Sequence, residues 1–129
     1  MAEPGVVPDP SRPVRVANCS GFYGYRLAAA REMIDGGPID VLTGDWLAEL
    51  TMLILARTRA KRPGGGYAHT FVKQMEQVMG TCLDKGIKVV SNAGGLDPEG
   101  CALAVAEVAA RLGLAPKIAF VRGDDLMPR

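Results

Sequence analysis

The chain has 129 residues, of which 48% are hydrophobic, 22% charged and 5% aromatic, and its formal net charge is +1. This composition excludes a disordered or fibrous protein and fits one modest domain with an aliphatic core. The near-neutral charge gives no overall field that would attract nucleic acid or an anionic membrane surface. We therefore expect a small-molecule substrate, with no nucleic acid and no membrane among the partners.

Strand and helix patterns alternate along the chain. In chain order, we expect a strand at 14–18, a helix from about Tyr25 to Gly36, a strand at 39–42, helices from about Trp46 to Arg62 and at 67–85, a strand at 87–91, a helix at 97–112 and a strand at 117–121. This order predicts an α/β fold, a three-layer open sheet of about four parallel strands with helices on both faces, Rossmann-like or flavodoxin-like. Two helices would share the second crossover.

Three of the predicted helices have one apolar face. These faces comprise Leu27, Ala30 and Ile34 in the first helix, Phe71, Met75, Val78 and Cys82 in the third, and Cys101, Val105, Val108 and Leu112 in the fourth. The second helix is apolar nearly all round until the basic run 57–62, so we expect its middle to be buried on more than one side. Residues 43–45 are expected to cap this helix, and Asp97 followed by Pro98 to cap the last one.

The N-terminal residues, the most apolar run and the cysteines indicate in which cellular compartment the protein is located. Residues 1–12 contain three prolines and no apolar signal segment, so we interpret them as a flexible Pro-rich leader and 13–129 as a single α/β domain. The most apolar run, 46–56, is about half the length of a membrane span. Cys19, Cys82 and Cys101 form neither a disulfide framework nor a metal-binding pair, so a cytoplasmic location is expected.

Four polar, glycine-rich turns follow the predicted strands, at 18–21, 43–45, 91–95 and 122–125. Any one such turn can arise from capping and turn geometry alone. Ligands of open parallel sheets, however, bind beyond the carboxyl ends of the strands, where the strand order reverses, and four such turns at one edge favour a binding rim. The substrate-binding candidates are Asn18, Ser20, Gly21, Thr43, Gly44, Glu49, Asn92, Gly94, Gly95, Asp124 and Asp125.

Asp45 is the candidate for acid/base catalysis. Clustered carboxylates shift one another's pKa, and Asp45 would share the rim with 124–125, although helix capping by Asp45 is an equally simple role. The turn 92–95 offers backbone amides to an anion, but Asp97 and Glu99 already place negative charge there. Neither metal-ligand spacing nor a nucleotide-binding fingerprint is present, so we expect no metal site and leave the cofactor unassigned.

Three stretches, 18–24 (NCSGFYG), 36–52 (GGPIDVLTGDWLAELTM) and 88–96 (KVVSNAGGL), resemble the amino-terminal part of the acyclic terpene utilisation family, AtuA. The resemblance covers about 13–125. Members of that family are several times longer and are associated with bacterial breakdown of acyclic terpenes, such as citronellol and geraniol, through coenzyme A thioesters. The resemblance implies that this chain corresponds to the first part of a longer family member and that the rim candidates belong to a site.

The resemblance and the rim together imply an enzyme or enzyme subunit in acyclic terpenoid or branched acyl (acyl-CoA) catabolism, which binds a small carboxylate or thioester at the carboxyl ends of the strands. Its reaction is unassigned, and whether the chain is itself an enzyme stays open. The alternative is a noncatalytic truncated or split module that binds a partner chain or a small ligand. A nucleotide-binding domain without the usual fingerprint is a third hypothesis. Because four strands leave open sheet edges, a homo-oligomer or a complementing subunit is expected.

Overall fold

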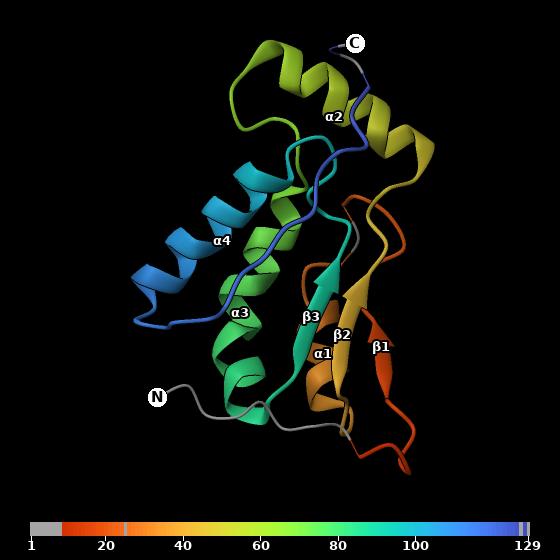
Figure 1. The fold of residues 1–129 in the computed structure, drawn as a ribbon, viewed down its shortest axis with the longest axis vertical. Helices are drawn as coiled ribbons and strands as arrows, with labels where there is room; N and C mark the ends of the chain where they lie inside the picture. The colour runs from red at the N-terminus through yellow and green to blue at the C-terminus, as the bar shows by residue number, and fades with distance from the viewer. Residues whose placement is uncertain (1–8, 25, 127, 129) are drawn as a thin grey trace.

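The computed structural model describes residues 9–24, 26–126 and 128. Its elements in chain order are β1 (Val16–Asn18), α1 (Ala29–Asp35), β2 (Val41–Gly44), α2 (Glu49–Lys61), α3 (His69–Lys85), β3 (Lys88–Ser91) and α4 (Pro98–Arg111) (Figure 1). The predicted alternation is confirmed for the first seven elements. The expected helix start at Tyr25 and residues 1–8 of the expected leader lie outside the described residues.

The three strands form one parallel sheet in the order β1-β2-β3. Ala17, Leu42 and Val89 occupy one register row, and all three belong to the main core, in which Leu42 is fully buried. Helices α1 and α3 contribute Ile34 and Val78 to the same core. The alternation of side chains along each strand therefore places one face of the sheet against α1 and α3.

The prediction of helices on both faces of the sheet is wrong for the described residues. Helices α1 and α3 contact each other and the same sheet, and α4 packs against α3 (Figure 1). On the opposite face Val16 and Val90 are 60% and 61% exposed. The strand order explains this arrangement, because right-handed crossovers between strands that are added in one direction place their helices on one side.

The predicted fourth strand at 117–121 is also wrong, and the sheet has three strands rather than four. Within the described residues, no backbone hydrogen bond joins 115–126 to β3. Side-chain ion pairs hold this segment instead, from Arg122 to Glu99 at 2.7 Å and from Asp125 to Arg59 at 2.9 Å. These pairs direct the segment toward the first turn of α4 and toward α2 rather than along the edge of β3 (Figure 1).

Helix α2 differs most from its prediction. It begins at Glu49 rather than near Trp46, its N-cap residue Ala48 makes no side-chain capping bond, and the helix lies beyond the carboxyl ends of the strands (Figure 1). Only Thr51 and Leu55 are fully buried, so the expectation of burial on more than one side is wrong. Trp46 is completely buried, but it lies before the helix, in a small cluster with Ala68 and Ala93.

The predicted start of α4 and the predicted end of α3 at residue 85 are confirmed. Asp97 caps α4, because its Oδ1 accepts a hydrogen bond from the amide of Gly100 at 2.9 Å and Pro98 occupies the first turn. Gly86 ends α3 in the left-handed conformation, with φ of 67°. The predicted apolar faces hold for α3 and for most of α1 and α4, whereas Leu27 and Leu112 are exposed.

Residues 9–12 of the expected leader are attached to the domain. The amide of Arg12 donates to the carbonyl of Asp9, which forms a turn, and the Arg12 guanidinium donates to both carboxylate oxygens of Asp40. Arg15 contacts the same carboxylate through its backbone amide and its side chain. Asp40 therefore fixes the entry into β1 against the entry into β2. In the part of the chain that is described, no helix combines the length and apolar character needed to cross a membrane.

Candidate functional site

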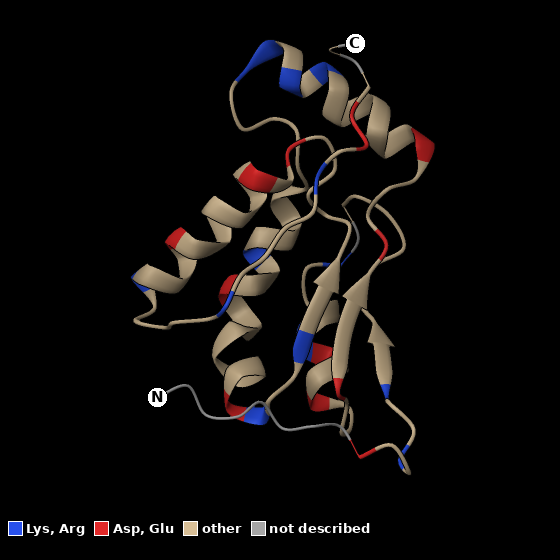
Figure 2. Ribbon diagram, viewed as in Figure 1, with Lys and Arg blue, Asp and Glu red and all other residues tan. Residues whose placement is uncertain are grey.

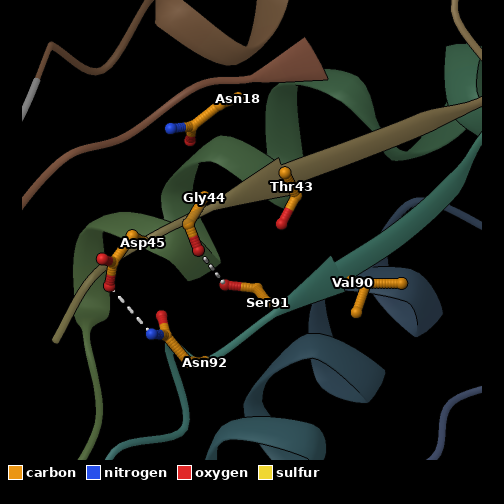
Figure 3. A pocket seen from close by; sticks show the side chains of 7 residues that line it. All are labelled: Asn18, Thr43, Gly44, Asp45, Val90, Ser91 and Asn92. Atoms are coloured by element: carbon orange, nitrogen blue, oxygen red, sulfur yellow. Dashed lines mark hydrogen bonds between the residues drawn. The ribbon is translucent and has the colours of Figure 1, made fainter. Parts of the chain in front are cut away.

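An open depression of about 450 Å³ lies over the carboxyl ends of the three strands (Figure 3). Asn18, Thr43 and Val90 form its floor, since they occupy one register row, one from each strand, on the face that none of the described helices covers. Gly44, Asp45, Ser91 and Asn92 complete the lining. The predicted meeting of the first three strand ends is thus confirmed, although the strand order does not reverse there.

Asp45 and Asn92 form the polar border of this depression. The Nδ2 amide of Asn92 donates to Oδ1 of Asp45 at 2.9 Å (Figure 3). Oδ1 of Asn92 accepts from the backbone amide of Trp46 at 2.8 Å. The amide of Leu47 also donates to Oδ1 of Asp45, at 3.1 Å. Asp45 therefore orders the turn between β2 and α2, where it accepts the amide of a residue that precedes the helix.

These hydrogen bonds also lower the pKa of Asp45. The donor Asn92 and, after it, the amide of Leu47 stabilise the charged carboxylate and lower the pKa of Asp45 below its ordinary value. A carboxyl with a lowered pKa is ionised at neutral pH, so Asp45 carries a negative charge there. Its chemistry in this position is that of a negatively charged hydrogen-bond acceptor.

The three candidates in the turn after β1, namely Asn18, Ser20 and Gly21, have different surroundings. Oδ1 of Asn18 accepts the amide of Ser20 at 3.1 Å, and Asn18 lines the depression. Ser20 is buried, and its hydroxyl donates to the carbonyl of Phe22 at 3.0 Å. Gly21 follows in the same turn and is exposed. Ser20 and Gly21 therefore shape the turn after β1 and do not line the depression.

Four further rim candidates, Gly94, Gly95, Asp124 and Asp125, lie away from the larger depression. Gly95, Asp124 and Asp125 line a second, smaller depression of about 220 Å³ beside the first turn of α4, where Asp125 is paired with Arg59. Gly94 packs against Pro98, since a Cβ at Gly94 would lie 2.8 Å from the Cα of that proline. The carboxylates of Asp124 and Asp125 thus line a different depression from the one bordered by Asp45.

Glu49 lies outside both depressions. It is exposed in the first turn of α2, and among the described residues it forms no ion pair. The structure therefore places this candidate away from the strand ends that were expected to surround it.

Val90 and Ser91 line the depression but are not among the residues predicted to bind substrate, although Ser91 belongs to the predicted rim turn 91–95. The Ser91 hydroxyl lies 3.5 Å from the carbonyl of Gly44 and accepts the amide of Ala93 at 3.1 Å. The sequence pattern predicts Val90 in the interior of a strand that helices cover on both faces. Its two-residue spacing from Lys88, a charged residue that avoids the core, was the signal that this side of β3 is uncovered.

The other reactive side chains do not enter the depression. All three cysteines are buried and form no disulfide bond. Burial raises the pKa of Cys19 and of Cys82, and it raises the pKa of Cys101 to about 12, so these thiols are protonated at neutral pH. In residues 9–24, 26–126 and 128, no group of three His, Cys, Asp or Glu side chains is placed to hold a metal ion.

A comparison with curated proteins gives no match, and a comparison with solved structures gives none either. The model of the acyclic terpene utilisation family protein AtuA, by contrast, matches residues 14–129. The matched range contains every described strand and helix and all seven residues that line the larger depression. Because the match spans nearly the whole chain, the protein belongs to the acyclic terpene utilisation (AtuA) family.

Proposed function

We propose that the chain is an enzyme or enzyme subunit in acyclic terpenoid or branched acyl catabolism, and that it binds the oxygen-bearing end of its substrate in the depression over the strand ends. Family membership supports the pathway class. The observation that supports the binding mode is the row Asn18, Thr43 and Val90, which combines an amide donor and a hydroxyl with an apolar side chain on an uncovered face.

The charge of the lining favours a neutral ligand group. None of the seven residues that line the depression is Lys or Arg, and Asp45 contributes a negative charge (Figure 2). A free carboxylate would meet repulsion from Asp45 without a compensating cation. A thioester carbonyl can accept hydrogen bonds from Asn18 and Thr43, and a hydroxyl can donate to Asp45. Of the two expected ligands, the thioester therefore fits better than the carboxylate.

An apolar surface that could hold the aliphatic part of such a ligand lies beside the polar lining of the depression. Val16 and Val90 lie on the same uncovered face of the sheet, and both are largely exposed. A branched aliphatic chain placed along this face would remove the valine side chains from water, which is the main favourable term in binding of an apolar group. Asp45 is proposed to orient the substrate as a hydrogen-bond acceptor rather than to act as an acid.

Ligand titration followed by amide NMR tests the binding mode. The probes are citronellol, the corresponding carboxylate and the corresponding thioester. The alcohol and the thioester are expected to shift the signals of Asn18, Thr43 and Asn92, and the carboxylate is expected to bind least. Thr43→Val should weaken binding about threefold to tenfold through loss of one hydrogen bond. The same substitution at Thr58, on α2, is the control, and shifts confined to other residues would contradict the proposal.

A genetic experiment tests the pathway separately. A strain that lacks the protein is expected to lose growth on citronellol while it retains growth on acetate. Wild-type protein should restore growth and Asp45→Asn should not, because the neutral amide removes the charged acceptor. Full restoration by Asp45→Asn would exclude the proposed role of Asp45, and normal growth of the deletion strain would exclude the pathway.

The noncatalytic alternative has one observation in its favour. All-parallel sheets occur almost only with both faces covered, whereas here one face exposes Val16 and Val90. A partner chain on this face would occlude the depression. Binding of a partner that competes with citronellol would favour the alternative.

A further inference from the structure

Helix α2 has two sides of different character. Its inner side carries Thr51 and Leu55, which are 3% and 2% exposed. Its outer side carries Leu50, Leu53 and Ile54, which are 67%, 47% and 39% exposed. Three large aliphatic side chains within five residues thus form a stripe that nothing in the described part of the chain covers. A stripe of this kind on a helix is typical of a helix that packs against another helix.

The charges on α2 run along the same outer side. Glu49, Leu53, Arg57 and Lys61 are spaced four residues apart, so they form one ridge of the helix. The helix is acidic at its first residue and basic over its last turns (Figure 2). Within the described residues, Glu49, Arg57 and Lys61 form no ion pair. The stripe is therefore bordered by opposite charges, both of which are unpaired in a single copy.

This pattern is complementary to itself when one copy is turned end to end. In an antiparallel pair of α2 helices that cross at Leu53, Glu49 of each copy lies opposite Arg57 of the other, because each is four residues from the centre. The two aliphatic stripes meet between these two ion pairs. We propose that α2 is the dimerisation surface of this protein and that its occupant is the α2 helix of a second copy, in the antiparallel orientation.

The contributions of the two kinds of contact differ. Burial of six aliphatic side chains drives the association, since exposed ion pairs contribute little. The ion pairs set the orientation, because a parallel pair would place Arg57 opposite Arg57. The uncovered sheet face is also apolar, but it carries no comparable pattern of paired charges. The proposal concerns a surface outside the depression and does not depend on the proposed function.

Sedimentation velocity and light scattering on the full chain, from micromolar to millimolar concentrations, test this proposal. The expected result is a concentration-dependent rise from the 13.6 kDa monomer to twice that mass. Leu53→Gln should weaken dimerisation by about tenfold or more, because it affects the centre of the interface in both copies. Leu103→Gln is the matched control, since Leu103 is 61% exposed on α4 and should leave the dimer unchanged.

A charge exchange tests the antiparallel orientation. Glu49→Arg and Arg57→Glu are each expected to weaken the dimer, and the double variant is expected to restore it, because the exchanged charges again face each other. Circular dichroism of each variant checks that α2 still folds. A chain that is monomeric at every concentration, or a dimer insensitive to Leu53→Gln, would overturn the proposal. A dimer lost in Val90→Lys but kept in Leu53→Gln would assign the second copy to the sheet face instead.

Discussion

The side chain of Asn92 joins the ends of two neighbouring strands, because its Nδ2 donates to Oδ1 of Asp45 at 2.9 Å. Its Oδ1 simultaneously accepts the amide of Trp46 at 2.8 Å. One amide side chain after β3 thus holds both the carboxylate and the backbone of the turn after β2. This arrangement fixes the polar border of the depression and lowers the pKa of Asp45.

Replacement of Asn92 should affect both the stability and the pKa of Asp45. Asn92→Ala removes two hydrogen bonds and is expected to lower the free energy of unfolding by about 1–2 kcal/mol, measured by urea denaturation. The pKa of Asp45, followed by carboxyl NMR, should rise toward its ordinary value because the first cause of its lowering is lost. Asn92→Asp keeps an acceptor for Trp46 but places a like charge beside Asp45, so it should raise that pKa further. An unchanged pKa in both variants would contradict this account.

Acid should remove the stabilisation that the charge of Asp40 gives to the fold. The guanidinium of Arg12, followed by that of Arg15, lowers the pKa of Asp40 far below its ordinary range. Because the folded pKa is the lower one, the stabilisation is present above the unfolded value of about 3.9 and disappears as pH falls through the folded value. Asp40→Asn should therefore lower the melting temperature at neutral pH, and the difference from wild type should shrink as the pH falls below about 4. A difference that is constant with pH would contradict the role of this charge.

Gly95 is expected to tolerate no side chain. Its φ is +54°, and a Cβ there would lie 2.6 Å from Cδ1 of Leu55 and 2.8 Å from the carbonyl of Gly66. Gly95→Ala should destabilise the fold by about 1–3 kcal/mol, because it adds a clash to an unfavourable backbone conformation. Gly86→Ala is the matched control, since Gly86 has φ of +67° with nothing within 4 Å of its Cβ position. Equal losses in the two variants, measured by thermal unfolding, would exclude the contact with Leu55.

The three cysteines should be unreactive in the native protein. Burial raises the pKa of each thiol, to about 12 for Cys101, so almost no thiolate is present at neutral pH. An aromatic disulfide reagent should modify them slowly in the folded chain and rapidly after denaturation in guanidinium. Fast modification of one cysteine without unfolding would show that its site opens, and mass spectrometry of the labelled peptide would identify it.

Local signals in the sequence predicted most elements correctly. Asp97 and Pro98 indicated the start of α4, and the spacing of Met75, Val78 and Cys82 indicated a buried helix face. Such signals are reliable because they depend on neighbours within one or two turns of the same segment. The start of α2 was predicted too early, since Asp45 accepts the amide of Leu47 in the preceding turn, which is an alternative to helix capping.

The sequence by itself determined the composition of the strand ends and the alternation of strands and helices, because both follow from residue types at fixed spacing. Only the tertiary structure decided that the strands run in the order β1-β2-β3, which places α1 and α3 on one face and leaves Val16 and Val90 uncovered. It also decided which rim candidates meet, since Asp45 and Asn92 share one depression while Asp124 and Asp125 line another. The physical reason is that strand order and the path of 114–126 depend on contacts between distant segments, which periodicity within a segment does not encode.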